Sequence, residues 1–271
     1  MATIKSRVNT IGTLRSDFIK AKDMEIEKFD NTPAMKASKI SSTLLRSTVL
    51  YLARWQNGMD KLVAFKHAIE GADRCGKRET AEHLLKIITK FDDVSIKAAT
   101  QLSTFDVWVN NASSAGEAIR WCDVDVDNVT CENIRTLIDR TVDFFYIYGP
   151  ITVDRFDFMP TNPDMEDYMS MLAGGSKSYG GYTKEVGGGW GDFLTGDTIW
   201  DFTCSKANPT TKDIMCIVVK YIMGKHCGRY EFHNIKNIGI FNPVLNEVYT
   251  YDMSKLNPEI VRDIEDKILC Y

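Results

Sequence analysis

Two aspartates in the segment GDFLTGDTIWDFTCSK, residues 191–206, have the residue type and spacing of a divalent-metal site. If Gly196 and Asp197 form a two-residue hairpin turn, which glycine at the first position favours, Asp192 lies opposite Asp201. Directly opposed side chains point to the same face of a sheet, with Cβ atoms about 5 Å apart. Two carboxylates that close repel each other unless a cation lies between them, and their oxygens suit Mg²⁺ or Mn²⁺. An exposed acidic hairpin without an ion would have the same spacing.

The other face of this hairpin is aromatic. In the same register Phe193 faces Trp200, and Phe202 follows on the same side. These rings can pack into a core while the paired acids stay at the outer edge. That arrangement is expected of a site built on a rigid scaffold.

After residue 150 the sequence predicts the strands and helices that must position these side chains. Residues 151–160 have strand-like alternation, and the segment that follows is rich in loop residues, with eight glycines between Gly174 and Gly191. Two short strands then flank Gly196, and a buried helix comes next. The predicted order is helix 130–149, strand 151–160, the two strands of the hairpin, helix 209–228, strands 235–243 and 246–253, and helix 257–271.

The chain before residue 150 reads as mostly helical. Residues 35–58 form a long apolar-periodic stretch that its terminal Asn-Gly pair would end. Two shorter helices are expected next, broken at Gly71 and Gly76. We therefore expect an α+β fold, with a helical domain at 1–128 followed by an α/β domain with a mixed sheet at 129–271.

This pattern resembles the PD-(D/E)XK nuclease superfamily over about residues 130–256. The resemblance rests on the helix–strand–strand–strand–helix–strand order, with one aspartate on one strand and a second on the next. In that family the two acids bind a divalent ion, which activates water and stabilises the leaving oxygen of a phosphodiester. The resemblance implies a restriction-endonuclease-like core in which Asp192 and Asp201 are catalytic and hold Mg²⁺ or Mn²⁺.

The chain departs from the family pattern at two places. The family has a lysine two residues after the second acid, where this chain has Thr203, whose hydroxyl carries no charge. Lys206, three residues further on, could supply the charge or be an exposed lysine at a strand end. Some members also have a Q-x-x-x-Y pattern on the next helix; here Cys216 and Lys220 occupy that spacing, and Tyr221 is one residue late.

Charge is unevenly distributed. Residues 123–143 carry six acids and two bases, whereas residues 203–236 carry six bases and two acids. A basic stripe beside an acidic site would suit a phosphodiester substrate, and a solvated helix face would have the same composition. The candidate substrate-binding residues are Lys212 and Lys220 in the basic segment and Tyr182 and Lys184 in the glycine-rich loop.

Other polar residues on helices have two interpretations. A third metal ligand could come from Glu132, Asp139 or Asp143, but a solvated polar stripe has similar spacing. Arg46, Arg54 and Trp55 could form an interaction face, or Trp55 could be packed in the core with the aliphatic stems of the two arginines along apolar surface.

Composition limits the class of protein. The chain has 271 residues, 44% of them apolar, and no run approaching the roughly 18 apolar residues of a membrane span. Its net charge of −4 argues against a non-specific nucleic-acid coat protein. Seven scattered cysteines without CxxC spacing indicate reduced thiols rather than a disulfide framework or a zinc site, and so a cytoplasmic protein.

Three functions follow as hypotheses. The first is a metal-dependent nuclease with a degenerate active site, for which DNA is the favoured substrate and RNA the alternative. The second is a catalytically inactive nuclease-fold protein that binds nucleic acid or a protein partner; by analogy of fold it would belong to a phage or mobile element and act in defence or counter-defence. The third is a structural or assembly protein without a nucleic-acid role.

Overall fold

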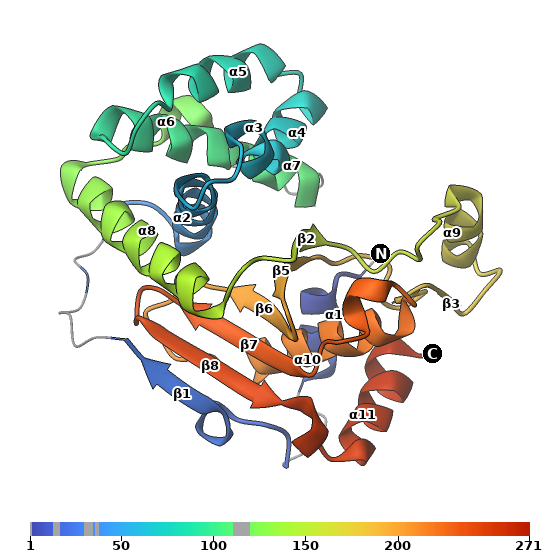
Figure 1. Ribbon diagram of the computed structural model, residues 1–271. Helices are drawn as coiled ribbons and strands as arrows, with labels where there is room; N and C mark the ends of the chain where they lie inside the picture. The colour runs from blue at the N-terminus through green and yellow to red at the C-terminus, as the bar shows by residue number, and fades with distance from the viewer. Residues whose placement is uncertain (1, 13–16, 30–34, 36–37, 111–119) are drawn as a thin grey trace.

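The protein is a six-stranded mixed sheet with helices on both faces (Figure 1). The computed structural model describes residues 2–12, 17–29, 35, 38–110 and 120–271. One face of the sheet packs against the long helix α8 (Asn128–Tyr148) and the helical half beyond it. The other face packs against α1 (Ile4–Ile11), α10 (Thr211–His226) and α11 (Pro258–Ile264). The predicted α+β class is confirmed.

The strands follow the order β1-β8-β7-β6-β5-β2. Their bounds are β1 Glu25–Lys28, β2 Val153–Phe156, β5 Gly191–Thr195, β6 Thr198–Phe202, β7 Asn237–Asn242 and β8 Glu247–Asp252. Neighbouring strands are antiparallel except β6 and β7, which are parallel and joined through α10. The hairpin strands and the β7–β8 pair lie where the sequence predicts them.

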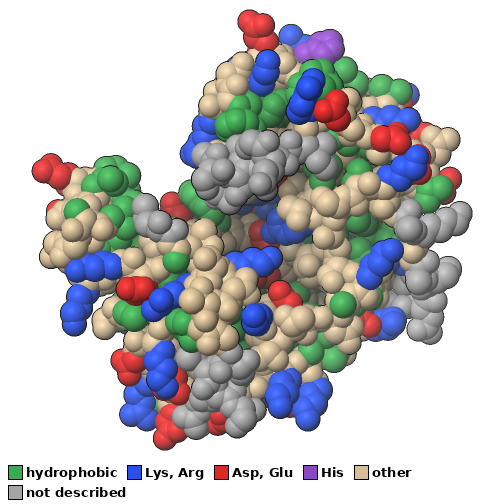
Figure 2. Space-filling view, turned by 180° about the vertical axis from the view of Figure 1, so that it is seen from behind, with side chains coloured by type: hydrophobic (Ala, Val, Ile, Leu, Met, Phe, Trp, Pro, Cys, Tyr) green, Lys and Arg blue, Asp and Glu red, His purple; other side chains and the backbone are tan. Residues whose placement is uncertain are grey.

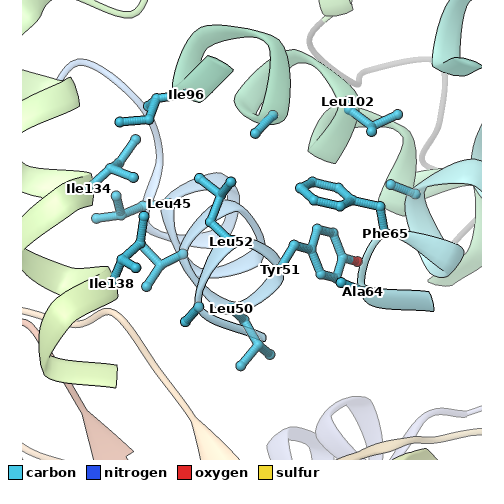
Figure 3. Packing of buried hydrophobic residues seen from close by; sticks show 14 of the residues in the cluster. Leu45, Leu50, Tyr51, Leu52, Ala64, Phe65, Ile96, Leu102, Ile134 and Ile138 are labelled. Carbon is cyan, nitrogen blue, oxygen red and sulfur yellow. The ribbon is translucent and has the colours of Figure 1, made fainter. Parts of the chain in front are cut away.

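The helical half packs around α2 (Ser42–Gln56). Figure 3 shows Leu45 of α2 beside Ile134 and Ile138 of α8, and Tyr51 beside Phe65. α2 ends before Asn57, as its Asn-Gly pair predicts. The other helices here are α3 Lys61–Ala64, α4 Lys66–Arg74, α5 Arg78–Ile87, α6 Asp93–Ser103 and α7 Val107–Asn110.

The N-terminal segment lies with the sheet rather than with the helical half. β1 is an edge strand that pairs with β8, and α1 contacts α10. The domain boundary at residue 128 stays a prediction, but these contacts show that the first half also completes the sheet.

Short elements fill the regions between the main ones. The predicted loop-rich segment contains α9 (Met165–Leu172) and the small β3–β4 ribbon (Ser178–Tyr179 and Tyr182–Thr183). α11 continues into a π-helical turn, Glu265–Leu269. Short 3₁₀ helices lie at Ala21–Asp23, Thr104–Asp106, Trp121–Asp123, Tyr230–Phe232 and Met253–Lys255.

Successive side chains of the hairpin point alternately into the two hydrophobic cores, which lie on opposite faces of the sheet. Phe193 and Trp200 point to the α8 side, and Leu194 and Ile199 point to the α10 side. Trp200 is 1% exposed; its ring lies edge-on to Phe144 at 4.9 Å between centroids. A strand buried on both faces in this way is held firmly in register.

Gly71 does not break its helix, contrary to the prediction. α4 runs through it and ends at Arg74. The reason for glycine here is a close approach of two backbones, because a Cβ added at Gly71 would lie 2.0 Å from the carbonyl oxygen of Phe105.

Replacing Gly71 by Ala is therefore expected to lower the free energy of unfolding by about 1–3 kcal/mol through overpacking. Gly196 is the matched control. No heavy atom lies within 4 Å of a Cβ added there, so Gly196→Ala should change stability by no more than about 0.5 kcal/mol. Urea unfolding of both variants measures the difference. Equal midpoints would contradict the close packing of α4 against residues 104–106.

Candidate functional site

The β5–β6 hairpin has the predicted register. Phe193 pairs with Trp200 and Thr195 with Thr198, so the turn contains two residues. Continued by one residue, this register places Asp192 opposite Asp201. The turn itself differs from the prediction in one respect: Gly196 does not have the positive φ of the expected glycine turn. The hairpin therefore does not depend on the conformational freedom of glycine.

Asp192 is held by groups from two other elements. Its Oδ2 accepts a hydrogen bond of 2.8 Å from the backbone N–H of Phe202. Its Oδ1 accepts from the guanidinium Nη2 of Arg46, on α2 of the helical half. Arg46 also donates through Nε to the carbonyl oxygen of Phe202, at 2.7 Å. The first acid is thus tied to both β6 and α2.

Asp201 is paired with Lys220. The Nζ of Lys220 donates to Oδ1 of Asp201, and the two side chains are 14% and 19% exposed. Lys220 comes from α10, whose first turn is fixed by a capping box in which Thr210 and Asp213 exchange hydrogen bonds. The helix then runs across its own face of the sheet and brings Lys220 to Asp201.

The four charged side chains interact electrostatically. Burial raises the pKa of Asp201, the charge of Asp192 raises it further, and Lys220 offsets only part of this. Burial acts in the same direction on Asp192, but the charges of Arg46 and Lys220 outweigh it and lower its pKa. Burial alone would lower the pKa of Lys220, yet Asp201 and Asp192 raise it above its usual range. Lys220 is therefore a protonated donor at neutral pH, and Asp192 is ionised.

Thr203 occupies the position of the family lysine, and Lys206 was the residue that could supply its charge. β6 ends at Phe202, and the backbone N–H of Thr203 continues the ladder to Phe241 at 3.0 Å. In the described part of the chain no ion pair joins Lys206 to either aspartate. Instead Lys206 lines a cavity of about 300 Å³ beside the start of α2. The other lining residues are Met35, Ser38, Ile40, Ser42, Leu45, Cys204, Ser205 and Val244.

A hollow separates the helical half from the sheet when the molecule is seen from behind (Figure 2). Acidic and basic side chains both lie within it. The side chains of Arg46, Asp201 and Lys220 are 26%, 19% and 14% exposed, so each is partly accessible to solvent.

The other predicted substrate contacts are dispersed. Tyr182 is 3% exposed, and its hydroxyl donates to the carbonyl oxygen of Gly189, so its ring is not placed to stack on a base. Lys184 donates to the carbonyl oxygen of Gly174. Lys212 is exposed in the first turn of α10, about two turns from Lys220. The candidate third acids, Glu132, Asp139 and Asp143, are exposed on α8, which covers the opposite face of the sheet.

The sequence pointed to Arg46 and Arg54 but not to their acidic partners, and so did not reveal the pair of Arg54 and Asp154 that lies beside Asp192. Arg54, also on α2, is 1% exposed; it pairs with Asp154 on β2 and donates to the carbonyl oxygen of Asp192 at 3.3 Å. Arg155 has φ of +44°, and its guanidinium lies over the ring of Tyr51, 5.7 Å from its centroid. The signal in the sequence was the spacing of eight between Arg46 and Arg54, which puts them on one side of a buried helix.

The donor set at the acid pair is of the right chemical type for Mg²⁺ or Mn²⁺. These ions take oxygen ligands, and Mg²⁺ commonly uses one or two carboxylates together with water and substrate phosphate. Among the described residues no three of His, Cys, Asp and Glu lie together as a metal site. The repulsion between Asp192 and Asp201 is offset here by Lys220 and Arg46.

No family model, curated protein or solved structure matches this chain. None of the described helices has the length and apolar character needed to cross a bilayer. All seven cysteines are free, as their spacing predicts.

Proposed function

We propose that this protein is a metal-dependent phosphodiesterase of the PD-(D/E)XK type that acts on DNA. The observation that carries the proposal is the contact of Lys220 Nζ with Asp201 Oδ1. Lys220 would take the place of the lysine that the family has two residues after the second acid. Apart from α9 and the β3–β4 ribbon between β2 and β5, the main elements follow the order α8–β2–β5–β6–α10–β7, with β6 and β7 parallel, which supports the same assignment.

The roles of the residues follow from their charges. Asp192 and Asp201 would hold Mg²⁺ or Mn²⁺, which would supply an activated water and stabilise negative charge on the phosphodiester. Without metal, Asp201 and Asp192 raise the pKa of Lys220 despite burial, and its ammonium group would act as a donor to a phosphate oxygen. The cavity beside Lys206 would receive the adjoining part of the strand.

Purified protein is expected to cleave linear DNA in Mg²⁺ or Mn²⁺, and Asp201→Asn should lower the rate by at least about 10²-fold. Gel analysis of DNA with and without EDTA measures this. Asp197→Asn is the matched control, because Asp197 lies at the turn of the same hairpin. Lack of cleavage of both DNA and RNA, in both metals, would contradict the proposal.

A binding protein without catalysis is the second candidate. It is favoured by the balance of charge in the site, where two acids face two bases and the fold needs no metal to offset their repulsion. Thr203→Lys separates the two candidates: cleavage by this variant alone would identify the natural protein as a binder derived from a nuclease.

A binding assay tests which class of partner such a binding protein would have. Binding of short duplexes that weakens steeply with salt would support a nucleic-acid partner over a protein partner or an assembly role. A cytoplasmic location and a role in phage or mobile-element defence belong to this proposal, and rest on the free cysteines and on analogy of fold respectively.

A further inference from the structure

We infer that Arg46 exchanges partners during the binding of metal and DNA: it holds Asp192 in the metal-free protein and turns to a phosphate of the DNA once metal is bound. This inference rests on the proposed function and gives the helical half a part in it. Arg46 lies on α2, yet both of its hydrogen bonds here go to the hairpin, to Asp192 and to the carbonyl oxygen of Phe202.

Arg46 and a metal ion would compete for the same carboxylate. The backbone N–H of Phe202 already occupies Oδ2 of Asp192, and Arg46 occupies Oδ1. A divalent ion on this carboxylate and the guanidinium bonded to it carry charge of the same sign, so each weakens the hold of Asp192 on the other. Binding of the ion at Asp192 therefore weakens or removes the contact with Arg46.

The charges of the site explain where Arg46 would go. Asp192 and Asp201 balance Arg46 and Lys220, so addition of a divalent ion leaves the group with an excess of two positive charges. A phosphodiester offsets part of that excess. An arginine side chain stays charged in proteins, and its planar guanidinium matches the geometry of phosphate oxygens.

Exposure singles out Arg46 among the arginines of α2. Its side chain is 26% exposed, whereas that of Arg54 is 1% exposed and bound to Asp154. The bond from Arg46 Nε to the carbonyl oxygen of Phe202 keeps the guanidinium at the site, so a change of partner for Nη2 needs only a small rotation. Metal and DNA should then bind cooperatively, because each relieves a charge that the other introduces.

Arg46→Met tests the exchange through two affinities that should change in opposite directions. Without DNA, removal of the competitor should raise the affinity for Mn²⁺ by about tenfold, as measured by isothermal titration calorimetry. With Mn²⁺ present, loss of a phosphate contact should lower the affinity for a short DNA duplex by about tenfold, as measured by fluorescence anisotropy. The anisotropy measurement compares Lys220→Met with Lys220→Met/Arg46→Met, so that cleavage does not interfere.

Two further variants serve as controls. Arg46→Lys keeps the positive charge and should bind Mn²⁺ about as the natural protein does. Arg78→Met removes an exposed arginine on α5, paired with Asp73 and Glu82, and should change neither affinity. Thermal melting checks that each variant is folded.

The outcomes separate this inference from the proposed function. If the natural protein binds Mn²⁺ and Arg46→Met binds it equally or more weakly, the exchange is wrong and the proposed function stands. If Mn²⁺ binding rises but DNA binding is unchanged, Arg46 blocks the metal without contacting the substrate, and the exchange is again wrong. Binding of Mn²⁺ by none of the folded proteins would overturn both.

Discussion

Lys220→Met is expected to lower the rate of metal-dependent DNA cleavage by about 10²–10³-fold, the cost typical of removing one preorganised donor from a developing charge. Lys220 contacts Asp201 on the sheet face that Asp192 shares, and its pKa is raised because the two carboxylates outweigh the effect of burial. Methionine keeps the length and apolar stem of the side chain but removes the charge. Initial rates with linear DNA in saturating Mn²⁺ measure the effect.

Two variants make this result specific to position 220. Lys212→Met removes a lysine from the exposed first turn of the same helix, and cleavage should stay within about twofold of the natural rate. Thr203→Lys, added to Lys220→Met, places a lysine at the spacing that the family uses and should restore part of the activity. Full cleavage by Lys220→Met would exclude Lys220 from the reaction.

The sequence predicted those features that depend on neighbouring residues. The hairpin register could be predicted because alternation places Phe193 and Trp200 in one core and Leu194 and Ile199 in the other, and a slip by one residue would reverse both. α10 was predictable for a similar reason, since its run of apolar residues is bounded by a capping box and a basic last turn.

The partners of the two acids could not be predicted in this way. Arg46 is 146 residues before Asp192, and Lys220 is 19 residues after Asp201 on a different element. No periodicity connects such residues. The spacing of the family motif put Lys220 at a tyrosine position, which gave no reason to expect an ion pair with Asp201.

A strained backbone conformation is a second reason why the sequence pattern of β2 does not predict which way its side chains point. The positive φ of Arg155 interrupts the alternation of β2, so that Val153 and Phe156 both pack on the α10 side although they are three residues apart. Arg155 can then lie over Tyr51 of α2. A residue held in an unfavourable backbone conformation must be stabilised by its surroundings, and the sequence of β2 alone does not contain them.

Arg54→Met is expected to lower the free energy of unfolding by about 3 kcal/mol, because Asp154 would be left partly buried without its cation. The side chain of Arg54 is 1% exposed, and that of Asp154 is 22% exposed. Arg54 Nη2 contacts Asp154 Oδ1, whereas within the described structure Arg54 Nε has no hydrogen-bond partner. Urea unfolding monitored by circular dichroism measures the loss.

The double variant Arg54→Met/Asp154→Leu distinguishes an unpaired charge from lost packing. It removes both charges and should recover most of the stability, since apolar side chains of similar volume often replace a buried ion pair without cost. Arg78→Met is the surface control; its side chain is 52% exposed, and its loss should cost no more than about 1 kcal/mol. If Arg54→Met were no more destabilising than Arg78→Met, the link from α2 to β2 would contribute little to holding the helical half against the sheet that carries the site.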